Sequence, residues 1–204
     1  SITNLSFNDG RTAFDCLERA LPFPVEKRSS KALELVPFMQ ELNREILRVR
    51  ELRNGNYELR IDGQPVFRTT ADALAEGINL AALTDTPQYK HAVEVRRIVT
   101  RRHSLEKVIR TYALLKQRFF PDNDELTPAT EAEILQSNLE KLKGKTGVWN
   151  TYRRNMIEGY LGTPGGKAAA EKQCDELMQQ IYMLNGPQPH RYELVRAGES
   201  GRGK

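Results

Sequence analysis

Three histidines are the side chains of this chain best suited to act as general bases or metal ligands at neutral pH. His91 and His103 lie twelve residues apart in one predicted helix. That spacing separates them by roughly 18 Å, so they cannot share a metal ion. His190 stands alone before a predicted strand. We favour ordinary structural or surface roles for all three. The alternative is an enzyme built on His103 or His190, which would need a cleft and a carboxylate behind the imidazole.

No serine has the sequence context of a nucleophile elbow, although a Ser-His-Asp triad can assemble from distant positions. Position six after Asp122 in the acidic run 122–125 is Thr127, where an EF-hand needs glycine. The loop 162–167 lacks the Ser or Thr that follows the lysine of a phosphate-binding loop. Cys16 and Cys174 have no metal-type spacing and are expected to be free thiols. We therefore predict no metal and no cofactor.

Asn79 is a polar residue inside the apolar run Gly77-Ile78-Asn79-Leu80-Ala81. If it is buried, its amide must find partners, because an unpaired buried polar group costs about 1–3 kcal/mol. The structural interpretation is that this amide fixes the turn after Gly77.

Aromatic residues recur along the predicted helix 148–161, which carries Trp149, Tyr152 and Tyr160. Aromatic side chains at helical spacing usually pack in a core. The alternative is an aromatic surface, formed by Trp149 and Tyr152, that binds sugars.

Residues 1–85 are predicted to form a small β-rich base with one or two helices. Alternating apolar residues predict hairpins over 5–17 and 57–69, the second closed by the Asp62-Gly63 turn. Thr70 is the expected cap of a helix over 71–76 that ends at Gly77. An apolar stripe predicts another helix over 31–42, and because Pro37 lies inside it, the alternatives are a helix that begins late or one that kinks there. Residues 46–50 are expected to form a strand that feeds the second hairpin.

Residues 86–185 are predicted to form a region of long helices. The first runs over 89–120, with Thr86 as its cap and Pro87 at its first position. At 1.5 Å per residue it would be roughly 50 Å long, so we expect it to protrude or to pack along other long helices. Further helices are expected over 128–143, 148–161 and 167–184. A short strand within 186–197 and a disordered tail at 198–204 complete the prediction, and the fold class is α+β.

The first half of the chain, from about Leu5 to Arg102, resembles the C-terminal portion of bacterial SGNH/GDSL-type esterase-acylhydrolases. Several segments carry this resemblance in the same order and rough spacing: 20–24 (ALPFP), 42–49 (LNREILRV), 55–63 (GNYELRIDG), 77–81 (GINLA) and 86–87 (TP).

The catalytic blocks of that family are missing from this sequence. It has no Gly-Asp-Ser, and no aspartate lies three residues before any histidine. The resemblance therefore implies a non-catalytic accessory region that supports or gates a hydrolase core, whose reaction would be ester or acyl hydrolysis. It also implies a second interpretation for Gly77 and Asn79, namely that they face the substrate cleft of that core.

Composition and charge limit the partners of the chain. It has 204 residues and a net charge of +4, too small and too scattered an excess to predict nucleic-acid binding. No apolar run is long enough to span a membrane. The expected partners are a hydrolase core of the same polypeptide and a second copy bound through the long helices. A stand-alone binding or scaffolding module is the alternative function.

The chain begins with Ser1 inside a predicted strand, so we expect it to be a piece of a longer polypeptide. The residues of this chain do not determine its compartment. The family resemblance alone favours a periplasmic or secreted location, and any signal peptide would precede Ser1.

Overall fold

The computed structural model describes residues 1–8, 10–120 and 126–197 of the chain. These residues form two compact units, one containing residues 1–96 and those from 182 onward, the other containing residues 97–181. An antiparallel sheet lies in the first unit, and the described part of the second unit is helical. The predicted α+β class is confirmed.

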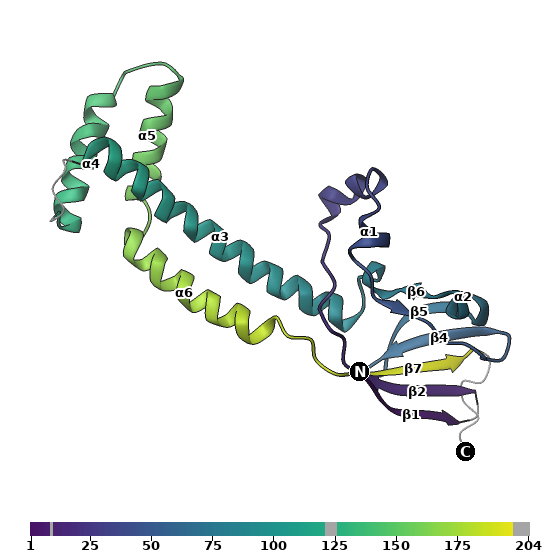
Figure 1. Cartoon of the computed structure of the whole chain (residues 1–204). Coiled ribbons are helices and arrows are strands. Elements are labelled where there is room, and N and C mark those ends of the chain that lie inside the picture. The colour runs from purple at the N-terminus through teal and green to yellow at the C-terminus, as the bar shows by residue number, and fades with distance from the viewer. Residues whose placement is uncertain (9, 121–125, 198–204) are drawn as a thin grey trace. The chain divides into compact units, whose positions relative to one another are not determined.

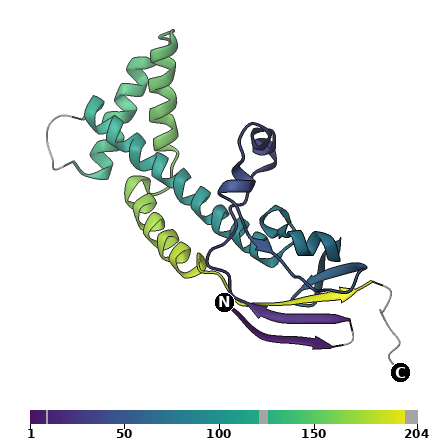
Figure 2. The ribbon, with the colours of Figure 1, turned by 45° about the vertical axis from the view of Figure 1, so that its right-hand side comes forward.

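The first unit is organised around five strands in the order β1-β2-β7-β4-β5 (Figure 1). The two predicted hairpins supply four of them: β1 (Ile2–Asn8) with β2 (Arg11–Cys16), and β4 (Asn56–Ile61) with β5 (Gln64–Thr70). The fifth, β7 (His190–Arg196), pairs with both β2 and β4. The predicted terminal strand is thus the central strand that joins the hairpins, as Figure 2 shows from a second direction.

Alternation in β4 places its apolar residues in the core of this unit. Tyr57, Leu59 and Ile61 are all buried, as the period-2 pattern predicted. Asp62 and Gly63 have φ values of 51° and 76°, the left-handed conformation that a two-residue primed turn requires. On the neighbouring strands Phe14 stacks on Tyr192 with ring centroids 5.1 Å apart, which closes the core over β2 and β7.

The predicted helix over 31–42 is wrong. The chain forms a 3-10 helix over Lys27–Glu34 (η1) and a short helix α1 over Phe38–Glu41. Pro37 immediately precedes α1, and because proline has no backbone N–H and clashes with the preceding turn, one continuous helix cannot form. The apolar stripe is consequently not buried, and Leu35 and Leu42 are 85% and 77% exposed.

The predicted strand over 46–50 is also corrected. Only Ile46–Leu47 forms a strand, β3, and it pairs with β6 (Ile78–Asn79) instead of joining the second hairpin. Between them, α2 spans Ala71–Glu76. Its cap is confirmed, because the Thr70 hydroxyl accepts the Ala73 N–H at 3.2 Å and the helix ends at Gly77. A short 3-10 turn, η2 (Leu80–Ala82), follows β6.

The long helix is confirmed as α3, which covers 33 residues from Pro87 to Phe119. The Thr86 hydroxyl accepts the Tyr89 N–H at 3.2 Å at its start. Helices α4 (Pro128–Leu142) and α5 (Val148–Leu161) form a hairpin in the second unit (Figure 1). Their core is built from Leu115, Phe120, Leu135, Leu142 and Ile157.

Helix α6 (Gly166–Leu184) lies along α3 within the second unit, where the Cys174 thiol approaches the Arg102 carbonyl at 3.8 Å. Both cysteines are free, as expected. Among the helices that the structure describes, none combines the length and apolar character needed to cross a membrane. The acidic run 122–125 and the predicted tail 198–204 lie outside the described residues.

Candidate functional site

The side chain of Asn79 is bonded entirely to backbone groups of the first unit. Its Oδ1 accepts the N–H groups of Glu45 and Ala81 at 2.9 and 3.3 Å. Its Nδ2 donates to the carbonyl oxygens of Met39 and Asn43, both at 2.9 Å. Four hydrogen bonds use the full capacity of an amide side chain. Asn79 therefore fastens segment 39–45 to the loop after Gly77, and no group of its amide remains for a ligand.

Gly77 lies against β3. It has φ of 110°, and a Cβ added there would lie only 2.9 Å from Cγ2 of Ile46. Arg48 borders the same spot and donates from Nη2 to the Glu76 carbonyl at 3.0 Å. Ala81, at the end of the segment 77–81, lines a cavity of the first unit.

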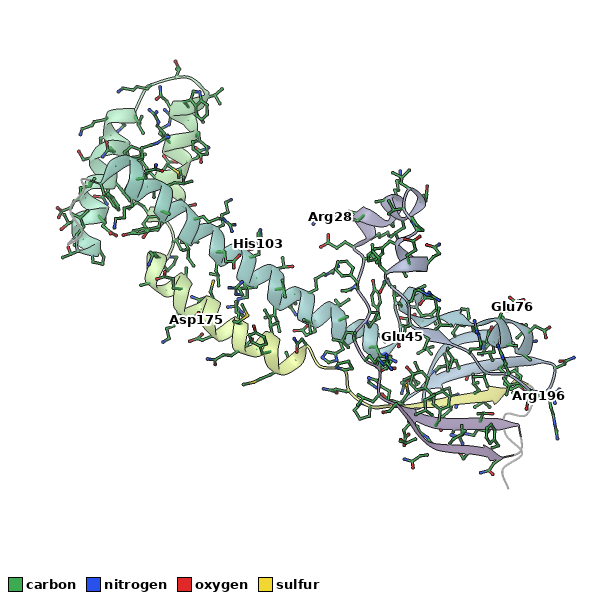
Figure 3. All side chains as sticks on the ribbon, in the orientation of Figure 1. Arg28, Glu45, Glu76, His103, Asp175 and Arg196 are labelled. Atoms are coloured by element: carbon green, nitrogen blue, oxygen red, sulfur yellow. The ribbon has the colours of Figure 1, made fainter. Side chains whose placement is uncertain are left out.

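That cavity lies in the first unit and has a volume of about 750 Å³, within the range of small-molecule sites. Two hydrogen bonds fasten its wall to α3: Tyr89 donates to the Val25 carbonyl at 3.2 Å, and Arg96 to the Pro24 carbonyl at 3.1 Å. Arg28, labelled in Figure 3, belongs to the segment that forms this wall. The lining joins apolar and basic side chains, among them Phe23, Val25, Lys27, Arg28, Leu33, Met39, Val93 and Arg96.

A cluster of buried polar groups lies in the same unit, where the end of β2, the segment before β3, the start of α3 and β7 meet. Gln88 is 1% exposed, and its Nε2 donates to Glu18 at 2.8 Å and to Glu45 at 3.4 Å. The Tyr192 hydroxyl is hydrogen-bonded to both Gln88 and Glu18. Glu45 is labelled in Figure 3 near the start of α3. We call these four residues the carboxyl cluster.

The carboxyl cluster changes the protonation of its members. Burial, the negative charge of Glu18 and a hydrogen bond to Glu18 raise the pKa of Glu45 to about 8. A carboxylate has no hydrogen to donate, so the two carboxyl groups can bond to each other only when one of them is protonated. Burial and the bond to Glu18 also raise the pKa of Tyr192, which therefore keeps its proton. With a pKa of about 8, Glu45 keeps its proton at neutral pH.

The carboxyl cluster contains no Ser, Thr, Cys or Lys side chain. Among the described residues, no group of three or more His, Cys, Asp and Glu side chains lies close enough to bind a metal ion. Sequence analysis missed these residues because Gln88 lies 70 and 43 positions from its two carboxyl partners. No local pattern connects residues so far apart in the sequence.

The histidines are dispersed. His91 contacts the Leu184 carbonyl through Nε2 at 2.6 Å, and His103 is an exposed residue next to Glu106. His190 has a carboxylate behind it, because its Nδ1 lies 2.7 Å from Oδ2 of Asp62. An enzyme built on His190 would also need a cleft beside the imidazole. His190 does not line either of the two cavities described here.

The aromatic candidates divide between surface and core. Trp149 and Tyr152 are 71% and 46% exposed and form an edge-to-face pair with centroids 6.4 Å apart. Tyr160 instead packs against the core of the second unit, 5.6 Å from Tyr112. Trp149 and Tyr152 therefore lie on the surface, where a sugar-binding role would require them to be. Tyr160 lies in the core, as helical spacing predicts.

Comparison with known proteins identifies one informative structural likeness. No family model matches the chain, and no curated protein matches it. A solved structure, described as BT4096, a gut microbial diltiazem-metabolizing enzyme, is similar with a TM-score of 0.77 and 31% sequence identity. The likeness covers 96% of this chain but 45% of the enzyme. This chain therefore spans less than half the length of the enzyme that it resembles.

Proposed function

We propose that this chain is a non-catalytic accessory region of an ester-hydrolysing enzyme, where it supports or gates a separate catalytic domain. The observation that carries the proposal is the unequal coverage of the structural likeness, which takes in 96% of this chain and 45% of an enzyme. Nearly all of this chain matches slightly less than half of the enzyme, as expected if it corresponds to one region of a larger enzyme. The Asn79 side chain, whose four hydrogen bonds all go to backbone groups of the first unit, agrees with a supporting role.

Ester hydrolysis is proposed from the sequence resemblance, and the structural likeness supports an enzyme as the larger protein. The order of segments between Leu5 and Arg102 resembles the tail of SGNH/GDSL-type hydrolases. The structural neighbour is described as a diltiazem-metabolizing enzyme. From the sequence resemblance we assign the catalytic partner of this region to ester or acyl hydrolysis.

Exposed apolar residues of the first unit supply the surface for the catalytic domain. Leu35 and Leu42 are more than three-quarters exposed, and they come from the segment whose predicted helix is broken at Pro37. The edge strand β1 also carries Ile2, Leu5 and Phe7 on its exposed surface. Concentrated exposed apolar area marks protein interaction sites in soluble proteins. We assign these two patches to contact with the catalytic domain.

A chimera tests the supporting role. This chain would replace the matching 45% of the diltiazem-metabolizing enzyme, and hydrolysis of a short-chain p-nitrophenyl ester would be measured. We expect an active chimera, loss of activity on Leu35→Glu, and no loss on Val148→Glu, a matched control that is 81% exposed in the second unit. Equal activity of the two variants would contradict the assignment of the docking surface.

The alternative function is a stand-alone scaffolding module that associates through its long helices. Val99 and Leu114 of α3 are 45% and 47% exposed, which favours a helical contact with another chain. Light-scattering mass at increasing concentration separates the two functions. A self-associating module becomes a dimer, whereas a supporting region stays monomeric.

A further inference from the structure

A hollow of about 390 Å³ in the second unit has the chemistry of a binding site. Helix α3 supplies one wall and helix α5 the other, and Gly159 of α5 has no side chain to fill the space between them. The volume lies within the range of small-ligand sites in proteins. The side chains that line it are Lys107, Val108, Thr111, Tyr152, Asn155, Met156, Tyr160 and Thr163.

Three polar side chains of the hollow have no partner within the described chain. Lys107, Thr111 and Asn155 make neither a hydrogen bond nor an ion pair to any described residue. Together they offer ammonium, hydroxyl and amide donors, and hydroxyl and amide acceptors. Thr163 is different, because its hydroxyl donates to the Gly159 carbonyl at 2.9 Å. The hollow thus presents several hydrogen-bonding groups that the fold itself does not use.

An aromatic pair borders these polar groups. Tyr152 lines the hollow, and its ring makes an edge-to-face contact with that of Trp149 at an angle of 88°, so Trp149 lies at the border of the hollow. Trp149 is 71% exposed although it is the largest apolar side chain. Leaving such a ring in water is unfavourable unless a partner covers it. An exposed ring beside unused polar groups is a platform for a ligand with one apolar face.

We propose that this hollow binds a neutral carbohydrate chain. The C–H face of one sugar ring stacks on Trp149, and hydroxyl groups of the same or the next ring bond to Asn155, Thr111 and Lys107. Lys107 is the one charged residue among those lining the hollow. Single-stranded nucleic acid also stacks on aromatic rings, but it needs a basic groove along its phosphates, which this lining does not provide. The proposal gives the second unit a ligand of its own and does not depend on the catalytic partner.

The single tryptophan of the chain makes the site directly observable. Trp149 fluorescence of the intact chain would be titrated with cello-, xylo-, malto- and chito-oligosaccharides. We expect a saturable change of intensity or emission maximum with at least one series. No saturable change with any of them would overturn the proposal, and so would tighter, salt-sensitive binding of an oligo-dT strand.

Variants locate the binding by calorimetry with the oligosaccharide that binds. We expect Trp149→Ala and Asn155→Ala each to lower affinity by about tenfold or more, a loss typical of removing one stacked ring or one well-placed polar contact. Tyr182→Ala is the matched control, since Tyr182 is equally exposed, at 71%, but lies outside the hollow. Melting temperatures of all variants would verify folding. Unchanged affinity of both site variants would overturn the proposal.

Discussion

Replacing Glu45 with glutamine tests the carboxyl cluster most sharply. Glutamine has nearly the same shape as a protonated glutamate and keeps a hydrogen to donate to Glu18, but it cannot ionise. The groups that face Glu45 are Glu18, Gln88 and Tyr192. Cys16 lies nearby, and burial together with the charges of Glu18 and Glu45 raises the pKa of its thiol. We expect Glu45→Gln to abolish most of the pH dependence that this cluster gives to stability.

The sign of this pH dependence follows from the pKa of Glu45 in the folded state, which burial and Glu18 raise from 4.5 to about 8. The folded state therefore binds a proton more tightly than the unfolded state. Its stabilising effect is complete below pH 4.5 and is lost as pH rises towards 8. At about 1.4 kcal/mol per pH unit, this range sets an upper limit of roughly 5 kcal/mol. Because Glu45 is partly exposed and can relax on ionisation, we expect a loss of about 2–3 kcal/mol.

Urea unfolding followed by circular dichroism at about pH 5 and about pH 9 would measure this difference. Hydrogen exchange of the β7 peptide would report the first unit directly, and Trp149 fluorescence would report the second unit as an internal reference. The wild type should lose stability between the two pH values, and Glu45→Gln should not. Glu34→Gln, an exposed control, should behave as the wild type. A Glu45→Gln variant with the pH dependence of the wild type would refute the raised pKa of Glu45.

Three further predictions concern Asn79 and Gly77, in the loop after α2, and Gly159, in α5. Asn79→Ala removes four hydrogen bonds to backbone groups and should destabilise the chain by about 2–4 kcal/mol in urea unfolding, whereas Asn138→Ala, which loses one bond within its own helix, should cost less than about 1 kcal/mol. Gly77→Ala should lower stability by about 1–3 kcal/mol, because its φ of 110° is unfavourable for alanine and the new methyl would meet Ile46. Gly159→Ala should instead raise stability by about 0.5–1 kcal/mol, since it lies in a helix with open space around it. Destabilisation by Asn79→Ala no larger than that by Asn138→Ala, or a neutral Gly77→Ala, would contradict these assignments.

Local elements could be predicted from the sequence because their signals lie in consecutive residues. The Asp62-Gly63 turn, the Thr70 cap and the start of α3 at Pro87 each depend on neighbours within a few positions. The prediction of a helix over 31–42 is wrong because it gave more weight to the apolar spacing than to Pro37. Proline lacks the backbone N–H that a continuous helix needs at this position.

Long-range features could not be read in the same way. The pairing of β7 with β2 and β4 joins opposite ends of the sequence, and no residue near His190 indicates its central place in the sheet. The carboxyl cluster likewise requires Glu18, Glu45 and Gln88 to meet through tertiary packing. Helical spacing placed Trp149 and Tyr152 on one helix but could not tell whether their face is buried, since that depends on which helices cover α5.

The non-catalytic role is tested most directly by ester hydrolysis measured on this chain by itself. A short-chain p-nitrophenyl ester would be the substrate, with the intact diltiazem-metabolizing enzyme as a parallel sample. We predict that this chain will not exceed the buffer rate. Turnover by this chain alone, abolished by His190→Ala, would contradict the accessory role and place a catalytic centre at the His190–Asp62 pair.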